Sequence, residues 1–198
     1  MAVNNRLYVD FHILQTVPPS CVNRDDTGSP KTAVYGGTVR ARVSSQAWKR
    51  AMRLMFREIF DESALGKRTK RVLQMVSNAI RTQDAAIAEK DAEKMAAEAL
   101  KKAGIKINKD KMSDVLFFMS EKQAETLAAL AIAGESEDKA YQAALLDAPS
   151  IDIALFGRMG ASDPSLNYDA AAQVAHSIST HAVQTEFDYF TAVDDLSP

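Results

Sequence analysis

The sequence predicts an α+β fold, in which strand segments accompany a long helical region. Apolar and polar residues alternate over Leu7–Leu14, which is the period of a half-buried strand. A second alternating segment covers Thr38–Val43. Over residues 61–148 the apolar residues instead recur at helical spacing in an alanine-rich sequence. Strands followed by a block of helices are typical of the α+β class.

The segment after the first predicted strand is a loop rich in Pro, Gly, Asp and Ser that extends to Gly37. Long ordered loops are more often functional than idle. In the following segment, Thr38–Val43, Arg40 and Arg42 occupy alternate positions. A strand there directs both arginine side chains to one face.

A helix with one cationic side is predicted directly after that strand. Ser44 or Ser45 is a suitable N-cap, and the helix is expected to reach about Phe60. At about 100° per residue, the polar and cationic residues fall within one arc. They are Gln46, Lys49, Arg50, Arg53 and Arg57. The apolar residues of the opposite side are expected to belong to the core, and they are Trp48, Ala51, Met52, Met55 and Ile59.

The middle of the chain divides into predicted helices over residues 67–80, 84–104, 120–134 and 136–148. Ser120 and Gln123 have the spacing of a capping box, and Gly104 and Gly134 are suitable C-terminal residues. The mixed charges of these helices are typical of solvated surfaces.

The region after the helical block predicts a short apolar strand, Ile151–Phe156, and a turn that carries Arg158 and Met159. Asn167 or Asp169 is a candidate N-cap for a last helix over residues 170–183.

Charge is distributed unequally along the chain, whose net charge is only −2. Residues 1–81 carry 14 Lys and Arg against 6 Asp and Glu, a net charge of +8. Residues 82–198 carry 10 against 20, a net charge of −10. This division favours a face that binds a polyanion, and ordinary variation of surface charge is the alternative.

Composition also indicates the cellular compartment. The single cysteine, Cys21, excludes an internal disulfide framework and suits a reducing compartment. The sequence shows no signal-peptide pattern and no apolar run of the roughly 20 residues that span a bilayer. We therefore expect a soluble, cytoplasmic protein.

Evidence for catalysis is weak. Cys21 has no neighbour that marks it as activated, and His176 and His181 are five residues apart rather than at the i, i+4 spacing of a helical zinc pair. The loop pair Asp25–Asp26 can hold a divalent cation, although turn formation or pairing with arginine is the more common role of such residues. We expect no enzymatic activity, no cofactor and no bound metal.

The residues of the predicted strand and helix suit phosphate groups. Guanidinium groups and the free N–H groups of a serine-capped helix N-terminus both stabilise negative charge. A row of Lys49, Arg50, Arg53 and Arg57 can follow a phosphate backbone, and such binding depends strongly on salt. Ion pairs with the acidic half of the chain are the structural alternative. An RNP1-type aromatic motif is absent from the sequence, so base reading by stacking is not indicated.

Several motifs, in the same order and over nearly the whole chain, resemble those of the CasC family, the backbone subunits of the type I-E CRISPR surveillance complex Cascade. They are PSCVNRDD (19–26), the GG pair with RARVSSQAWKRAMR (40–53), DIALFGRM (152–159), LNYDAAAQVAHSISTH (166–181) and FDYFTAVDDL (187–196).

The resemblance implies an RRM-like (ferredoxin-like) palm, a large helical fingers insertion and a hairpin thumb. Residues 1–60 correspond to the palm, residues 61–182 to the fingers, and residues 183–198 to the return to the palm and the start of the thumb. Family members are considerably longer. The chain is therefore expected to be the N-terminal half of such a subunit, with a palm that is incomplete at the C-terminus.

The resemblance also implies a function. Family members are non-catalytic proteins of antiviral defence that bind CRISPR RNA, stack as homo-oligomers along it and kink it at intervals. The expected partners are CRISPR RNA, target DNA that pairs with the guide, other copies of the chain and other Cascade subunits.

Motif position assigns RNA contacts to particular residues of this sequence. Those in the first motifs are Arg24, Arg40, Arg42, Ser45, Gln46, Lys49, Arg50 and Arg53. Arg158 and Met159 resemble the segment near the kinked nucleotide, where an apolar side chain wedges between bases. A second basic group has two possible roles, which are a further contact with RNA or target DNA, and a solvated basic turn. Its residues are Lys67, Arg68, Lys70 and Arg71.

Two other functions compete with this one. The first is a metal-dependent ribonuclease that uses Asp25 or Asp26, because type III backbone relatives cut RNA with an aspartate in a comparable loop. The second is a protein-interaction module whose basic helix docks on the acidic region of a neighbouring copy.

Overall fold

The chain divides into two units in the computed structural model, which describes residues 7–160 and 163–186. Unit 1 consists of Met1–Ser44 and His176–Pro198, and unit 2 consists of Ser45–Ala175. The predicted boundaries lie near residues 60 and 182 instead. The helix that begins at Ser45 belongs to unit 2 because its side chains bond to residues much later in that unit, as between Arg53 and Asp152.

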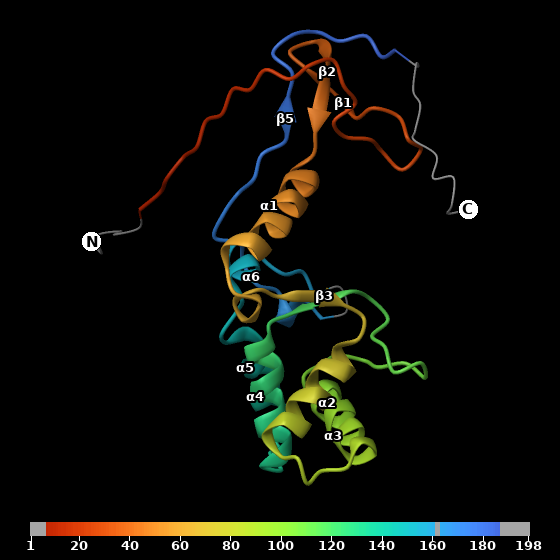
Figure 1. Cartoon of the computed structure of the whole chain (residues 1–198), viewed down its shortest axis with the longest axis vertical. Coiled ribbons are helices and arrows are strands. Elements are labelled where there is room, and N and C mark those ends of the chain that lie inside the picture. The colour runs from red at the N-terminus through yellow and green to blue at the C-terminus, as the bar shows by residue number, and fades with distance from the viewer. Residues whose placement is uncertain (1–6, 161–162, 187–198) are drawn as a thin grey trace. The chain divides into compact units, whose positions relative to one another are not determined.

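Unit 1 contains a three-stranded antiparallel sheet in the order β1-β2-β5 (Figure 1). Its strands are β1 (Thr32–Tyr35), β2 (Thr38–Val43) and β5 (Ser177–Ile178). Gly36 and Gly37 join β1 to β2, with φ angles of 64° and 75°. Two positive φ angles define the turn that matches the twist of a hairpin, and glycine adopts them without steric cost. The predicted strand over Thr38–Val43 is confirmed.

The predicted loop is wrong over Thr32–Tyr35, which forms the strand β1, and two further predicted elements of this region are wrong. Leu7–Leu14 forms no strand and is exposed throughout, with Phe11 at 85%. Alternation alone does not make a strand, because the backbone groups need a paired neighbour, and no segment in the described part of the chain pairs with this one. The predicted helix over residues 170–183 is also not formed. Its second half pairs with β2, where Ser179 and Val183 donate to the carbonyls of Ala41 and Val39.

Unit 2 is mainly helical. Its helices are α1 (Ser45–Ile59), α2 (Val72–Gln83), α3 (Glu89–Lys102), α4 (Glu121–Ile132), α5 (Asp138–Leu146) and α6 (Ile151–Phe156). Its antiparallel strand pair is β3 (Lys67–Thr69) with β4 (Phe117–Met119), and its 3₁₀ turns are η1 (Glu62–Ala64) and η2 (Pro164–Leu166). None of the helices in the described ranges is long and apolar enough to cross a membrane.

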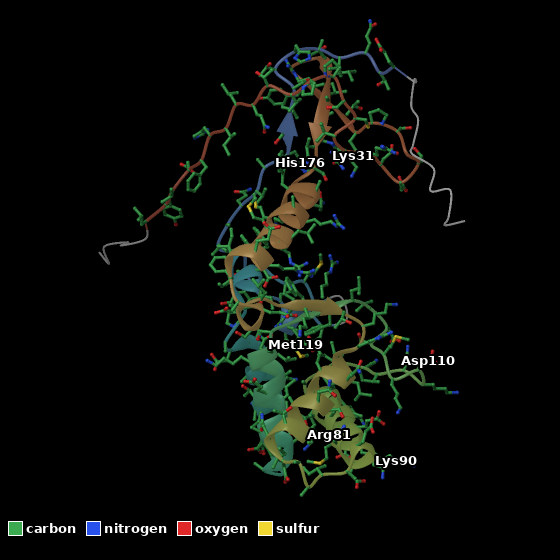
Figure 2. All side chains as sticks on the ribbon, in the orientation of Figure 1. Lys31, Arg81, Lys90, Asp110, Met119 and His176 are labelled. Carbon is green, nitrogen blue, oxygen red and sulfur yellow. The ribbon has the colours of Figure 1, made fainter. Side chains whose placement is uncertain are left out.

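The core of unit 2 lies where α2 packs against α3 and α4, and where α4 packs against α5 (Figure 1). Its fully buried side chains include Val76, Ile80, Leu100, Leu127 and Leu145. Met119 adds a buried side chain from β4, whereas Arg81 on α2 and Lys90 on α3 are exposed (Figure 2). The predicted amphipathic helices therefore bury the apolar sides that their periodicity defines.

The predicted helix ends are confirmed. Ser120 and Gln123 form a complete capping box at the start of α4. Gly104 and Gly134 follow α3 and α4 with φ angles of 87° and 69°. After α3, the Ile105 N–H donates to the Leu100 carbonyl, which is the bond of a Schellman motif.

Two short segments of unit 2 differ from the prediction. Ile151–Phe156 is the helix α6 and not a strand, because a short apolar run fits either element and the Ala154 N–H here donates to the Ser150 carbonyl. Lys67–Thr69 is the strand β3 and not the start of a helix. It pairs with β4, so α2 begins only at Val72.

Helix α1 is formed as predicted, but its apolar side is not part of a core. No residue of α1 is buried, and Met55 and Ile59 are 58% and 61% exposed. The contacts of α1 within unit 2 include those of Lys49, Arg53 and Phe56. The side that the sequence predicts to be cationic is thus the side that packs against α6.

Candidate nucleic-acid interface

The candidate site of unit 2 is the cationic face of α1, formed by Gln46, Lys49, Arg50, Arg53 and Arg57. Among the residues that the structure describes, none of the cations Lys49, Arg50 and Arg57 has a carboxylate within ion-pair distance. Gln46, Arg50 and Arg57 are exposed, and Lys49 and Arg53 are half-buried. The first turn, which begins at Ser45, holds no acidic side chain, so nothing there opposes a bound anion.

Arg53 differs from its neighbours because it is held on three sides. Its Nε donates to Asp152 Oδ2 at 2.9 Å, and its Nη2 donates to the Gly66 carbonyl at 3.3 Å. Its guanidinium also lies over the Phe118 ring, 4.4 Å from the centroid. The inner edge of Arg53 therefore supports the fold, and its assignment as an RNA contact stays a prediction.

Lys49 lies against one aromatic ring. Its Nζ lies 5.7 Å from the centroid of the Phe156 ring, within the range of a cation–π interaction. Phe156 in turn stacks on Phe56, with ring centroids 5.9 Å apart and planes inclined by 4°. No described carboxylate lies within ion-pair distance of the ammonium.

Asp152 is a residue of this site that the sequence does not reveal. It is 2% exposed and accepts three hydrogen bonds in all: Oδ1 accepts from the Gly66 N–H at 2.8 Å and from the Ser150 hydroxyl at 2.7 Å, and Oδ2 accepts from Arg53 Nε at 2.9 Å. A buried carboxylate is stable only when such donors surround it. The one available signal is an acidic residue inside the apolar run IDIALF.

Gly66 admits no side chain at this network. A Cβ there would lie 2.6 Å from Phe118 Cε2 and 2.6 Å from Ser150 Oγ. We expect Gly66→Ala to lower the free energy of unfolding by about 1–3 kcal/mol, because the new methyl overpacks the site. Urea denaturation followed by circular dichroism measures the loss. Ser63→Ala, at an exposed position of η1, is the control, and equal stabilities of the two variants would contradict the expectation.

Arg158 lies in the interior, which corrects its assignment as an RNA contact. It is 5% exposed, and its guanidinium donates to the carbonyls of Leu166, Phe118 and Leu145 and to Gln123 Oε1. It also lies over the Phe117 ring, at 4.9 Å. Burial lowers the pKa of Arg158 to about 10, so the group remains charged at neutral pH. Carbonyl dipoles, rather than a carboxylate, balance this charge.

Met159, the neighbour of Arg158, is 83% exposed. The backbone of Arg158 pairs with that of Tyr168 through two hydrogen bonds of 3.0 and 2.8 Å. The segment is therefore held by its backbone and by the buried arginine while the Met159 side chain projects into solvent. Its position is compatible with the apolar contact that the family resemblance assigns to it.

In unit 1, β2 carries two of the predicted arginines, and both are half-buried on one side of the strand, as expected. Arg40 is used by the sheet itself, because its Nε donates to the Tyr35 carbonyl and its Nη1 to the Ser179 carbonyl. Arg42 is different, since its buried Nε has no hydrogen-bond partner among the described residues. Buried donors are normally paired, so Arg42 is the better ligand candidate of the two.

The loop before β1 is organised by polar side chains. Arg24 is exposed and forms an isolated bridge with Pro30. Asn23, which the sequence does not single out, accepts the Ser44 N–H at 2.9 Å through its side chain. It thereby joins this loop to the end of β2.

Asp25 is occupied by its own turn. Its Oδ1 accepts hydrogen bonds from the Thr27 N–H, the Thr27 hydroxyl and the Ser29 N–H. The bond from the Thr27 hydroxyl is the main cause that lowers the pKa of Asp25. Within the described ranges, no group of three or more His, Cys, Asp or Glu side chains could hold a metal ion. The geometry gives no support to a metal site at Asp25 or Asp26.

The second basic group, around β3, is only partly available. Lys67 binds Glu121 at 2.6 Å, and this hydrogen bond raises the pKa of Lys67. Arg68, Lys70 and Arg71 are exposed. The structure does not bring these residues to the cationic face of α1 through any described contact.

Comparison with known proteins places this mixed α/β chain with its cationic helix in one family. The family model described as CT1975-like protein matches residues 9–198, and the chain belongs to that family. No curated protein matches it.

Two solved structures extend this result. A chain of a "CRISPR RNA-guided surveillance complex" is similar with a TM-score of 0.65 and 31% identity, over 85% of this chain and 57% of that one. A chain of a "CRISPR RNA-guided surveillance complex, pre-nicking" is similar with a TM-score of 0.67 and 33% identity, over 90% of this chain and 54% of that one. The present chain thus spans little more than half the length of either.

Proposed function

We propose that this chain is a non-catalytic backbone subunit of a type I-E Cascade complex and binds the phosphate backbone of CRISPR RNA. The observation that carries the proposal is the cationic face of α1, where Lys49, Arg50 and Arg57 have no described ion-pair partner. The similarity to chains of CRISPR RNA-guided surveillance complexes supports it.

In this function the protein holds phosphates and leaves the bases free. Arginine and lysine bind phosphate without regard to sequence, so a subunit of this kind fits any guide. Sequence is then read by pairing between guide RNA and target DNA. Stacking of copies in the cytoplasm, an RRM-like palm and helical fingers belong to the same proposal.

The proposal predicts a salt dependence that can be measured. If three or four cations of α1 each neutralise one phosphate of a single strand, the plot of log K against log salt has a slope of about −2 to −3. Fluorescence anisotropy of the full chain with a fluorescein-labelled single-stranded RNA, between about 50 and 200 mM salt, gives this slope.

A sample without protein provides the control for adsorption of the labelled RNA to surfaces. Binding that does not change with salt, or the absence of binding at the lowest salt concentration, contradicts the proposed function. Co-purification of a discrete small RNA that disappears on ribonuclease treatment is the complementary cellular result.

A further inference from the structure

Helix α6 supplies two side chains to the cationic face of α1. Asp152 and Phe156 are four residues apart on α6 and therefore lie on the same side of that helix. Their partners on α1, Arg53 and Lys49, are also four residues apart. Asp152 binds Arg53, and Phe156 lies beneath the ammonium of Lys49. The two helices thus run in opposite directions with two cations in register, one helical turn or about 5.4 Å apart.

The two α6 residues do not themselves face a ligand. Asp152 is buried, and both of its oxygens are used by Arg53, Gly66 and Ser150. Phe156 is half-buried between Lys49 and Phe56. Their effect on a bound polyanion is exerted through the cations that they hold.

The cations retain donors for a ligand. The side chain of Arg53 is 25% exposed, and its Nη1 has no hydrogen-bond partner among the described residues. Lys49 interacts through the face of a ring, which leaves the N–H groups of its ammonium available for phosphate oxygens.

We propose that Asp152 and Phe156 are positioning residues, which fix Arg53 and Lys49 in the conformations that bind two successive phosphates of the RNA. The inference rests on the proposed function. Long cationic side chains lose rotamer freedom when they bind, and a protein that has already restricted them loses less. Arg50 and Arg57, which no described residue holds, lack this advantage.

A double-mutant cycle separates positioning from simple stabilisation of the fold. Asp152→Asn keeps the size of the side chain but removes its charge, so we expect RNA affinity to fall about five- to tenfold. In an Arg53→Ala background the same change has no further effect, because the side chain that Asp152 positions is absent. Asp138→Asn, an identical change at an exposed position of α5, is the matched control and leaves affinity unchanged.

A second cycle uses the other pair. Phe156→Leu retains an apolar side chain but removes the ring, and its effect on RNA affinity is expected to vanish in a Lys49→Ala background. Each variant is tested as the full chain with fluorescein-labelled single-stranded RNA, and thermal melting by circular dichroism checks its folding. If Asp152→Asn unfolds at the assay temperature, the Phe156 cycle decides the matter.

The outcomes distinguish the inference from the function on which it rests. If the α6 changes weaken binding equally with and without their α1 partners, or do not weaken it at all, the positioning role is overturned while RNA binding stands. If Lys49→Glu with Arg50→Glu binds RNA as tightly as the unaltered chain, the proposed function fails and the inference with it.

Discussion

Replacing Arg158 by alanine is expected to lower the free energy of unfolding by about 3–5 kcal/mol. The guanidinium is buried and satisfies the carbonyls of Leu166, Phe118 and Leu145 together with Gln123. Alanine leaves those acceptors without donors and leaves a cavity beside the Phe117 ring. Urea denaturation of the full chain, followed by circular dichroism, measures the change.

Two further variants test the cause of this loss. Arg158→Lys keeps the charge but not the planar fork that reaches several carbonyls, so it recovers only part of the stability. Arg81→Ala, at an exposed position of α2, is the matched control and is expected to change stability by no more than about 0.5 kcal/mol. Equal stabilities of Arg158→Ala and Arg81→Ala would show that the buried network contributes nothing.

Reversing two charges on the cationic face of α1 is expected to have the largest effect on RNA binding. Lys49→Glu with Arg50→Glu removes two phosphate contacts, each worth about 1.5–3 kcal/mol, so affinity falls about 100-fold or more. The slope of log K against log salt becomes shallower by about 1.4, since two fewer counterion-release events occur on a single strand. Anisotropy titrations at several salt concentrations measure both quantities.

The control for this experiment changes the net charge of the chain by the same amount as the test variant. Arg81→Glu with Lys90→Glu makes an identical change at two exposed positions of α2 and α3, away from α1 in sequence (Figure 2). We expect only a small, uniform loss of affinity from this pair. Similar losses for both pairs would mean that RNA responds to the overall charge of the chain and not to the cationic face.

Much of the helical structure follows from local sequence. Helix α1 was predictable because its polar arc persists over a continuous segment, and α4 because Ser120 and Gln123 close a capping box within four residues. Two of the segments whose predictions were wrong depend on distant partners. Residues 177–178 pair with β2, and Lys67–Thr69 pairs with β4, so neither assignment is contained in the local pattern.

The sequence predicts which residues belong to the candidate site but not what each of them contacts. Charge identified Lys49, Arg50 and Arg53 alike, and motif position added Arg158, since sequence does not show which cation is paired. Arg53 meets Asp152, which lies 99 residues later, and Arg158 is surrounded by carbonyls that no side-chain pattern reveals. Electrostatic partners that are far apart in the chain can be identified only from the folded structure.

The carbonyls bound by Arg158 are separated from it by 8, 13 and 40 residues. One side chain therefore closes three loops of different size. Closing each loop lowers the conformational entropy of the chain. We expect these bonds to form late, after the local turns and helices, and to complete only when all three segments have arrived. We therefore expect a residue whose motif first suggested a role at the surface to act late in the assembly of unit 2.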